Sequence, residues 1–284
     1  MTVLGSQLGR QLRGQRRTLA VAVVLATAGV GLSFPTPAHG AADPRAGSGA
    51  SASPAAPQSA APYIRRGITI GRSVRGRAIR AYYRGTKDAK HVLVVLGQMH
   101  GDERAGRRTA WWVRDRVRPR DGTGVWIVPS MNPDGNARGT RTNARRVDLN
   151  RNWPTSGWSG ARRGTRYWGG PRPASEPETR AMIAFLREVR PDYIASIHQP
   201  LYGIGRHRGG IRWQERLSRN LDLPRRFFGV GNPRGTVSPT LTGWYSARFR
   251  DHGVATTIEY GARPGRRFVT VKAGRGITAA ARVR

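Results

Sequence analysis

Short apolar runs that alternate with amphipathic segments restrict the fold of this 284-residue chain more than any other feature. The runs have the length of buried strands and lie at His91–Leu96, Gly124–Pro129, Tyr193–Ile197 and Gly253–Ile258. The segments Arg104–Val117 and Glu176–Val189 have helical patterns. Strands and helices that alternate in this way predict an α/β domain with a largely parallel central sheet.

Local patterns add detail to the two predicted helices. Trp111, Trp112 and Val113 in the first helix are expected to pack in the core rather than to bind a ligand. Before the second helix, Ser175 stands three residues ahead of Glu178, which is the spacing of a capping box. We therefore expect Ser175 to be the N-cap and Glu178 to have a structural role.

Several residues of catalytic type follow the predicted strands. His100 and Glu103 lie three residues apart in a glycine-flanked turn after the first strand, and His198 and Glu259 end two later strands. The carboxyl ends of parallel strands share one edge of a sheet, so one crevice is expected to collect these side chains. The chain has no cysteine, which excludes disulfides and thiolate metal sites. Two histidines and one glutamate are typical of a catalytic zinc with an open position for water.

Water activated by zinc also needs a base that takes its proton and passes it to the leaving amine. Glu259 is a lone carboxylate after an apolar run, where a charge costs desolvation unless it is used or paired. Glu259 is therefore the predicted base. The alternative is a structural ion pair with one of the many arginines.

The segment between the two ligand regions supplies groups suited to substrate binding. A turn at Met131–Gly135 precedes arginines at positions 138, 141, 145 and 151. An arginine fork can bind a free carboxylate or stabilise an oxyanion, and Asn150 can add a neutral donor. Asp148 can accept a hydrogen bond from the far nitrogen of a ligand histidine. Residue type alone does not choose among the arginines.

The order of these motifs resembles the zinc carboxypeptidase family (peptidase family M14). The matching elements are His100-x-x-Glu103, Asn132-Pro133-Asp134-Gly135, the stretch from Asn143 to Asn152, Ser196-Ile197-His198 and Ile258-Glu259. The resemblance runs from about residue 65 to residue 262 and implies a mixed, largely parallel sheet flanked by helices. The Val-Asp-Leu-Asn-Arg-Asn form resembles the bacterial branch, which includes murein peptide amidases and γ-D-glutamyl-diaminopimelate peptidases.

The resemblance implies a role for each matched residue around the metal. His100, Glu103 and His198 match the ligands of one zinc ion, and Glu259 matches the catalytic glutamate. Asp148 matches the carboxylate that lies behind the first ligand histidine.

It also implies roles in substrate binding. Asn150 and Arg151 match the pair that holds the terminal carboxylate of the substrate. Arg141 matches the oxyanion arginine, with Arg138 and Arg145 as competitors.

One feature of many family members, a tyrosine on a mobile loop over the substrate, has no clear match. The stretch Arg234–Pro239 holds no tyrosine, and Tyr245 lies too close to Glu259 in the sequence. Ser238–Trp244 is expected to shape the specificity pocket and holds no carboxylate that would select a basic side chain.

The N-terminal part of the chain has the pattern of an export signal. Residues 1–40 combine a basic start, the apolar stretch Leu19–Leu32 and small residues before Ala41. The stretch is short for a membrane span, so we expect no stable span and a secreted or cell-envelope protein. Signal cleavage or retention, and export through the twin-arginine route suggested by Arg16-Arg17, stay open. Residues 41–62 predict an Ala/Ser/Pro-rich linker, and residues 63–284 the catalytic domain.

The formal charge of +34 comes almost wholly from arginine, since lysine occurs only at positions 87, 90 and 272. It indicates either attraction to an anionic cell-wall polymer or a compositional bias. The charge is spread along the chain rather than gathered in blocks, which favours the bias and predicts no specific nucleic-acid partner.

The first functional hypothesis is an exported zinc metallocarboxypeptidase. It would use zinc-activated water to hydrolyse an amide bond next to a free carboxylate, on murein peptides of the cell wall. The second is a zinc amidohydrolase of the aspartoacylase or succinylglutamate desuccinylase type, acting on N-acyl amino acids; the export signal argues against it. The third is a non-catalytic protein that binds polyanions, against which stands the full set of catalytic groups.

Overall fold

The computed structural model describes residues 61–229 and 238–284. The predicted export signal and all but the last two residues of the predicted linker lie outside these described residues. The first described strand begins at Tyr63, which is the residue at which the sequence predicts the catalytic domain to begin.

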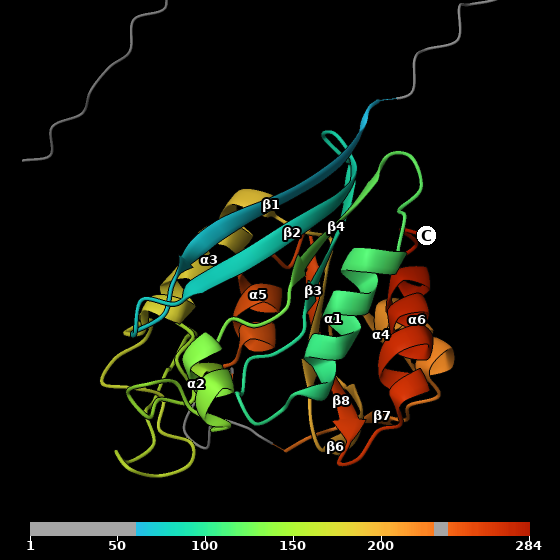
Figure 1. The fold of residues 1–284 in the computed structure, drawn as a ribbon. Helices are drawn as coiled ribbons and strands as arrows, with labels where there is room; N and C mark the ends of the chain where they lie inside the picture. The colour runs from blue at the N-terminus through green and yellow to red at the C-terminus, as the bar shows by residue number, and fades with distance from the viewer. Residues whose placement is uncertain (1–60, 230–237) are drawn as a thin grey trace, which may run out of the picture. The chain divides into compact units, whose positions relative to one another are not determined.

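A mixed eight-stranded sheet runs through the domain (Figure 1). Its strands are β1 (Tyr63–Arg72), β2 (Ala78–Thr86), β3 (His91–Leu96), β4 (Thr123–Val128), β5 (Tyr193–His198), β6 (Leu201–Gly205), β7 (Arg225–Arg226) and β8 (Val254–Gly261). They are arranged in the order β1-β2-β4-β3-β5-β8-β6-β7. The central strands β4, β3, β5 and β8 are parallel to one another, whereas β1, β2 and β6 join them by antiparallel pairings. The predicted fold class is confirmed.

Helices cover both faces of the sheet (Figure 1). They are α1 (Ala105–Arg116), α2 (Pro133–Arg138), α3 (Pro177–Val189), α4 (Ile211–Leu221), α5 (Leu241–Arg248) and α6 (Ala273–Ala280), with a 3₁₀ turn at Leu149–Arg151 and a π-helical segment at Phe268–Lys272. One buried cluster joins α1, α4 and α6 to the sheet, and a second joins α3 and α5 to it.

Strand β3 shows why the central strands appear in the sequence as continuous apolar runs. Leu93 and Val95 belong to the cluster under α1, α4 and α6, whereas Val94 and Leu96 belong to the cluster under α3 and α5. Successive side chains of a strand point to opposite faces, so a strand covered on both sides has no polar face. Because β3, β5 and β8 are parallel, their carboxyl ends lie at one edge of this buried sheet.

The two predicted helices form within one residue of their expected ends, as α1 and α3. Val113 is buried in the core and Trp112 packs against it, as predicted. Trp111 is half-buried and lies outside this cluster, with its ring centre 5.5 Å from that of Tyr82. The predicted capping box is wrong. Glu176 is the N-cap of α3 and no side chain caps it; the Ser175 hydroxyl donates a hydrogen bond to Glu176 Oε1 at 2.8 Å. The proline that begins α3 lacks an N–H, which leaves fewer donors for a cap to satisfy.

Glu178 has the structural role that the sequence predicts. It is buried and accepts hydrogen bonds from the backbone N–H of Val74 at 3.0 Å and from Asn143 Nδ2 at 3.2 Å. The carboxylate thus ties α3 to the turn between β1 and β2 and to the segment that leads to Asp148. None of the helices in the described part of the chain is long and apolar enough to cross a membrane.

His91, at the start of β3, is expected to contribute to the stability of the fold in a pH-dependent way. His91 Nδ1 lies 3.4 Å from Asp192 Oδ2 and its Nε2 lies 2.7 Å from the carbonyl oxygen of Ala281, so only the protonated ring can donate to both acceptors. The hydrogen bond to Asp192 raises the pKa of His91 above its usual 6.5. Its contribution should therefore be complete below pH 6.5 and be lost as the pH rises through the folded-state pKa.

The expected contribution of the His91–Asp192 pair to the unfolding free energy is about 0.5–1 kcal/mol, because the pair is partly exposed to solvent. Urea unfolding of the protein and of His91→Gln, measured on both sides of neutrality, tests it. The difference in unfolding free energy between the two proteins should shrink as the pH rises; a difference that is constant or that grows contradicts the prediction.

Candidate metal centre and substrate cleft

The turn after β3 places the first two predicted ligands. His100 and Glu103 lie on either side of a tight turn in which the Glu103 N–H donates to the His100 carbonyl at 3.1 Å. Gly101 in this turn packs directly on the backbone of Gly135 in α2, where a Cβ atom would collide. The turn therefore requires glycine at position 101. Its contact with α2 fixes the position of the backbone that carries both predicted ligands.

The third predicted ligand and the predicted base come from the parallel pair β5 and β8. His198 is the last residue of β5, and it stands opposite Glu259 in the register of the two strands. Neighbouring strands lie about 4.8 Å apart, so both side chains start from adjacent points at the same edge of the sheet. The strand-end placement predicted from the apolar runs is what brings them together.

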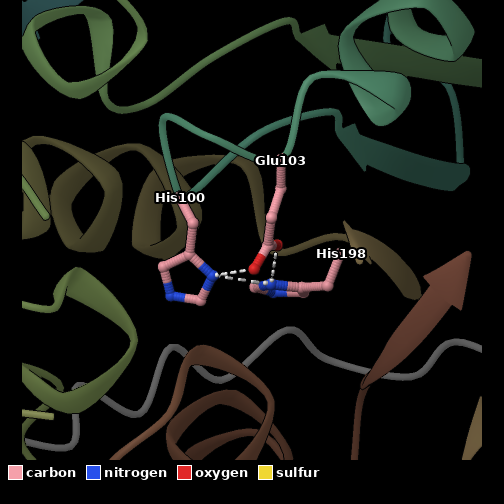
Figure 2. Close-up of side chains that lie close together, drawn as sticks. All are labelled: His100, Glu103 and His198. Carbon is pink, nitrogen blue, oxygen red and sulfur yellow. Dashed lines mark hydrogen bonds and ion pairs between the residues drawn. The ribbon is translucent and has the colours of Figure 1, made fainter. Parts of the chain in front are cut away.

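His100, Glu103 and His198 converge on one point (Figure 2). Glu103 Oε1 lies 2.8 Å from His100 Nδ1, and Glu103 Oε2 lies 3.0 Å from His198 Nδ1. The two Nδ1 atoms are 3.3 Å apart. One donor atom from each of the three residues falls within 4.8 Å of the others, and all three side chains are buried.

This donor set fits a zinc ion. Two imidazole nitrogens and one carboxylate oxygen are the ligands of many catalytic zinc sites, and they leave a position open. Two ring nitrogens that face each other at 3.3 Å need a cation or a shared proton between them. Burial opposes charge on His100, but the carboxylates of Glu103 and Asp148 outweigh it and raise the pKa of His100 to about 9. The site therefore favours positive charge.

Asp148 organises the centre from behind. It is fully buried, and its Oδ1 lies 3.0 Å from His100 Nε2 while its Oδ2 accepts from Arg141 Nη2 at 2.9 Å. A donor at Nε2 leaves Nδ1 of His100 free to bind a metal, which is the usual effect of such a carboxylate. Burial raises the pKa of Asp148, but the charges of His100 and Arg141 lower it by more than burial raises it. The carboxyl group is therefore ionised.

The Asp148→Asn variant is expected to lose metal affinity by about 10–100-fold, because a neutral amide replaces the carboxylate that orients His100 and raises its basicity. It should also lose about 3–5 kcal/mol of stability, because Arg141 is left without its buried partner. Zinc titration against a competing chelator and urea unfolding measure the two effects. Asp115→Asn, at an exposed carboxylate paired with Arg114, is the matched control and should show neither.

Of the three arginines considered for the oxyanion, the structure brings only Arg141 to the centre. Arg141 Nη1 lies 3.3 Å from Glu103 Oε1. Arg138 donates to the Asn143 carbonyl at 2.6 Å, and Arg145 lies 3.7 Å from Glu176.

Asn150 and Arg151 lie on the 3₁₀ turn after Asp148, and both line the same cleft as the metal ligands. Asn150 Oδ1 accepts from the Leu241 N–H at 3.2 Å, which leaves its amide nitrogen for another partner. Among the described residues, Arg151 Nη1 donates to the Asn150 carbonyl alone, at 2.8 Å. Burial lowers the pKa of Arg151 more than the charge of Asp148 raises it. A carboxylate that binds this guanidinium would therefore stabilise its charged form.

Glu259 faces the cleft without a basic partner among the described residues. Its Oε2 accepts from the Leu201 N–H at 3.2 Å, and burial raises its pKa more than His198 lowers it. The alternative of a structural ion pair with an arginine finds no support in the described part of the chain. A carboxylate with a raised pKa and a free oxygen can take up and return a proton.

The cleft has a volume of about 640 Å³ and collects seven of the eight predicted site residues. They are His100, Glu103, Arg141, Asn150, Arg151, His198 and Glu259; Asp148 lies buried behind them. Ser238, Thr240, Thr242 and Gly243 from the predicted specificity segment also line it. Tyr245 does not: it is fully buried, and its hydroxyl donates to the Pro191 carbonyl.

Several residues of the cleft wall could not be recognised from the sequence. The ring of Tyr167 lies against two predicted site arginines, 5.6 Å from Arg141 and 5.3 Å from Arg151, measured from the guanidinium carbon to the ring centre. Arg206 and Arg208 line the wall after β6. Neither place carries a local motif. One sequence feature does coincide with these walls: they are formed by stretches without aspartate or glutamate, such as residues 193–214.

A buried centre of two histidines and a glutamate, with a second glutamate in the same cleft at the edge of a mixed sheet, defines a metal-dependent hydrolase. The family model described as zinc carboxypeptidase matches residues 55–200, and the chain belongs to this family. The recognition made from the motifs is confirmed.

Named relatives agree with this assignment. The chain is 32% identical over 174 residues to murein peptide amidase A of Vibrio campbellii, an alignment that covers 55% of this chain and 66% of that protein. It is 30% identical over 142 residues to murein peptide amidase A of Escherichia coli, covering 46% and 58%. The chain thus spans less than two thirds of the length of these relatives.

Solved structures share the fold. A murein-tripeptide amidase from Escherichia coli superposes with a TM-score of 0.59 at 24% identity, covering 76% of this chain and 91% of that one. The carboxypeptidase A from Helicoverpa armigera gives a TM-score of 0.60 at 18% identity, covering 77% and 69%.

Proposed function

We propose that this protein is an exported zinc metallopeptidase that hydrolyses an amide bond next to a free carboxylate in murein peptides. The observation that carries the proposal is the single cleft that holds the three metal donors, Glu259, Arg141 and the pair Asn150–Arg151. The similarity to two murein peptide amidases supports the choice of substrate. Export rests on the sequence pattern of residues 1–40.

Zinc is the proposed metal, and it would be held by His100, Glu103 and His198. When bound, it supplies a Lewis acid that polarises the scissile carbonyl and lowers the pKa of water. Every other part of the proposed reaction is assigned to side chains of this chain.

Glu259 is the proposed general base and acid. It takes one proton from the attacking water and delivers it to the leaving nitrogen, so that a C–O bond replaces the C–N bond and an amine leaves. The Leu201 N–H holds Oε2 of Glu259, which fixes the carboxylate and leaves Oε1 for the proton.

Arg141 and the Asn150–Arg151 pair are the proposed substrate contacts. Arg141 adjoins Glu103 in the cleft, from where its guanidinium can donate to the carbonyl oxygen as that oxygen gains negative charge. Arg151 and the amide nitrogen of Asn150 can bind the terminal carboxylate of the substrate. The distance between this anchor and the metal centre then determines which amide bond is cut.

Hydrolysis of the murein tripeptide L-Ala-γ-D-Glu-diaminopimelate tests the proposal. Release of diaminopimelate should stop when a chelator is added and return when zinc is restored. An N-acyl amino acid serves as the second substrate. Faster turnover of the N-acyl amino acid would replace the proposal with the amidohydrolase alternative, and no metal-dependent hydrolysis of either compound by the zinc-loaded protein would leave the non-catalytic hypothesis.

A further inference from the structure

The walls of the cleft carry more positive charge than one terminal carboxylate requires. Five arginines line the described cleft, at positions 141, 151, 166, 206 and 208, against two carboxylates, Glu103 and Glu259. Both carboxylates already have tasks at the metal centre and in proton transfer. Arg141 is paired with Asp148, and Arg151 is assigned to the terminal carboxylate.

The excess belongs to the segments that build the walls. Residues 149–175, 193–214 and 223–250 contain no aspartate or glutamate at all, although the chain has 16 such residues. In the described part of the chain no carboxylate pairs with Arg166, Arg206 or Arg208. Their charges therefore stand available to an incoming anion.

Arg206 and Arg208 are exposed, but the backbone that carries them is fixed. The Arg206 N–H donates to the Arg226 carbonyl at 2.7 Å, which extends the pairing of β6 with β7. The buried amide of Gln214 donates to the carbonyls of His207 and Gly209, at 2.9 and 2.7 Å. A short loop with three such bonds holds its two arginines on one wall.

The same loop borders a polar recess of the cleft. His207 Nε2 lies 3.1 Å from Thr256 Oγ1, so the loop runs alongside β8 only a few residues before Glu259. Thr242, Ser246 and Thr257 line the cleft here with small hydroxyl side chains. The recess can admit a polar side chain but offers no carboxylate for a basic one.

We propose that Arg206 and Arg208 form a second carboxylate-binding subsite, which selects substrates whose leaving residue carries a second carboxylate on its side chain. This rests on the proposed function, because it assumes that the terminal carboxylate occupies Asn150 and Arg151. An arginine fork pairs with a carboxylate through charge-assisted hydrogen bonds, and two forks on one rigid loop favour a diacid over its amide. Diaminopimelate carries such a carboxylate, next to an ammonium group, at the far end of its side chain.

The test compares L-Ala-γ-D-Glu-diaminopimelate with the same tripeptide whose distal diaminopimelate carboxylate is amidated. The change removes one charge and keeps nearly the same shape. The zinc-loaded protein should cleave the diacid with a kcat/KM about tenfold higher, a factor of ten corresponding to about 1.4 kcal/mol. In Arg206→Gln and Arg208→Gln the ratio between the two peptides should fall, and in the double variant it should approach one.

Arg212→Gln is the matched control, because Arg212 is exposed on α4 close to the loop but does not line the cleft. It removes the same charge and should leave the ratio as it is in the unaltered protein. An equal fall in Arg212→Gln would indicate a general effect of net charge and overturn the subsite. Equal rates on the two peptides in the unaltered protein would also overturn it.

Calorimetric binding of the two peptides to the zinc-loaded Glu259→Gln protein separates this proposal from the proposed function. Hydrolysis without any preference between the peptides rejects the subsite alone. A binding preference that depends on Arg206 and Arg208, without hydrolysis by the unaltered protein, rejects the peptidase and retains the subsite. Absence of both hydrolysis and preference rejects the two together.

Discussion

Glu259→Gln is expected to lower kcat on the murein tripeptide by about 10²–10⁴-fold, which is the range that a positioned acid–base group contributes. Glutamine keeps the size of the side chain and can still accept from the Leu201 N–H. It cannot take up a proton from water or return one to the leaving nitrogen. Because Glu259 donates no atom to the cluster of His100, Glu103 and His198, the zinc content should be unchanged.

The measurement combines kcat and KM with zinc analysis and a thermal unfolding curve of the same preparation. KM should change little, since the groups assigned to the substrate carboxylate are untouched. Glu188→Gln, at an exposed glutamate on α3, is the control and should behave as the unaltered protein. Substantial turnover by a folded, zinc-loaded Glu259→Gln protein would show that another group is the base.

The elements that carry the site are the ones that the sequence predicts best. β3, β4, β5 and β8 are buried on both faces, so each appears in the sequence as an apolar run. Such a run can be identified as a strand without knowledge of the strands beside it. His198 and Glu259 stand at the ends of such runs, and a shared sheet edge follows from parallel pairing. The distances among the predicted ligands depend on the turn at Gly101 and its contact with α2, and no local sequence pattern predicts that contact.

Other elements are specified by contacts with distant residues. The strands β1 and β2 form an antiparallel hairpin at the edge of the sheet, and much of β1 is exposed, so its sequence shows no apolar run. α5 is only eight residues long and depends on the Thr240 side chain, which accepts from the Gly243 N–H at 3.0 Å, and on packing against β8. Short elements of this kind gain little from intrinsic propensity.

The cleft walls illustrate the same limit at the level of single residues. Arg141 could be singled out by its place in a motif, whereas Arg206 and Arg208 are two among many arginines until the loop after β6 places them in the cleft. Tyr167 is positioned by backbone bonds such as the one from the Asp148 N–H to the Trp168 carbonyl, at 2.8 Å. These contacts link segments about twenty residues apart, so spacing gives no indication of them.

Removal of the metal is expected to abolish hydrolysis and to destabilise the fold. A buried carboxylate and two imidazoles with nitrogens 3.3 Å apart are arranged to bind a cation, so the folded protein should bind zinc far better than the unfolded chain. Binding to the folded state alone stabilises it by about 4 kcal/mol when free zinc is a thousandfold above Kd. The melting temperature should therefore fall on chelation and recover together with activity when zinc is added back.

His198→Ala extends this prediction to a single ligand. Loss of one of three donors should weaken zinc binding by more than the roughly 10–100-fold typical of an outer partner such as Asp148. The variant should be inactive at zinc concentrations that saturate the unaltered protein, and chelation should no longer shift its melting temperature. His252→Ala, at an exposed histidine, is the control and should keep both responses. Full zinc binding by His198→Ala would place the metal on other residues, and the assignment of Glu259 and Arg141 would then lose its geometric basis.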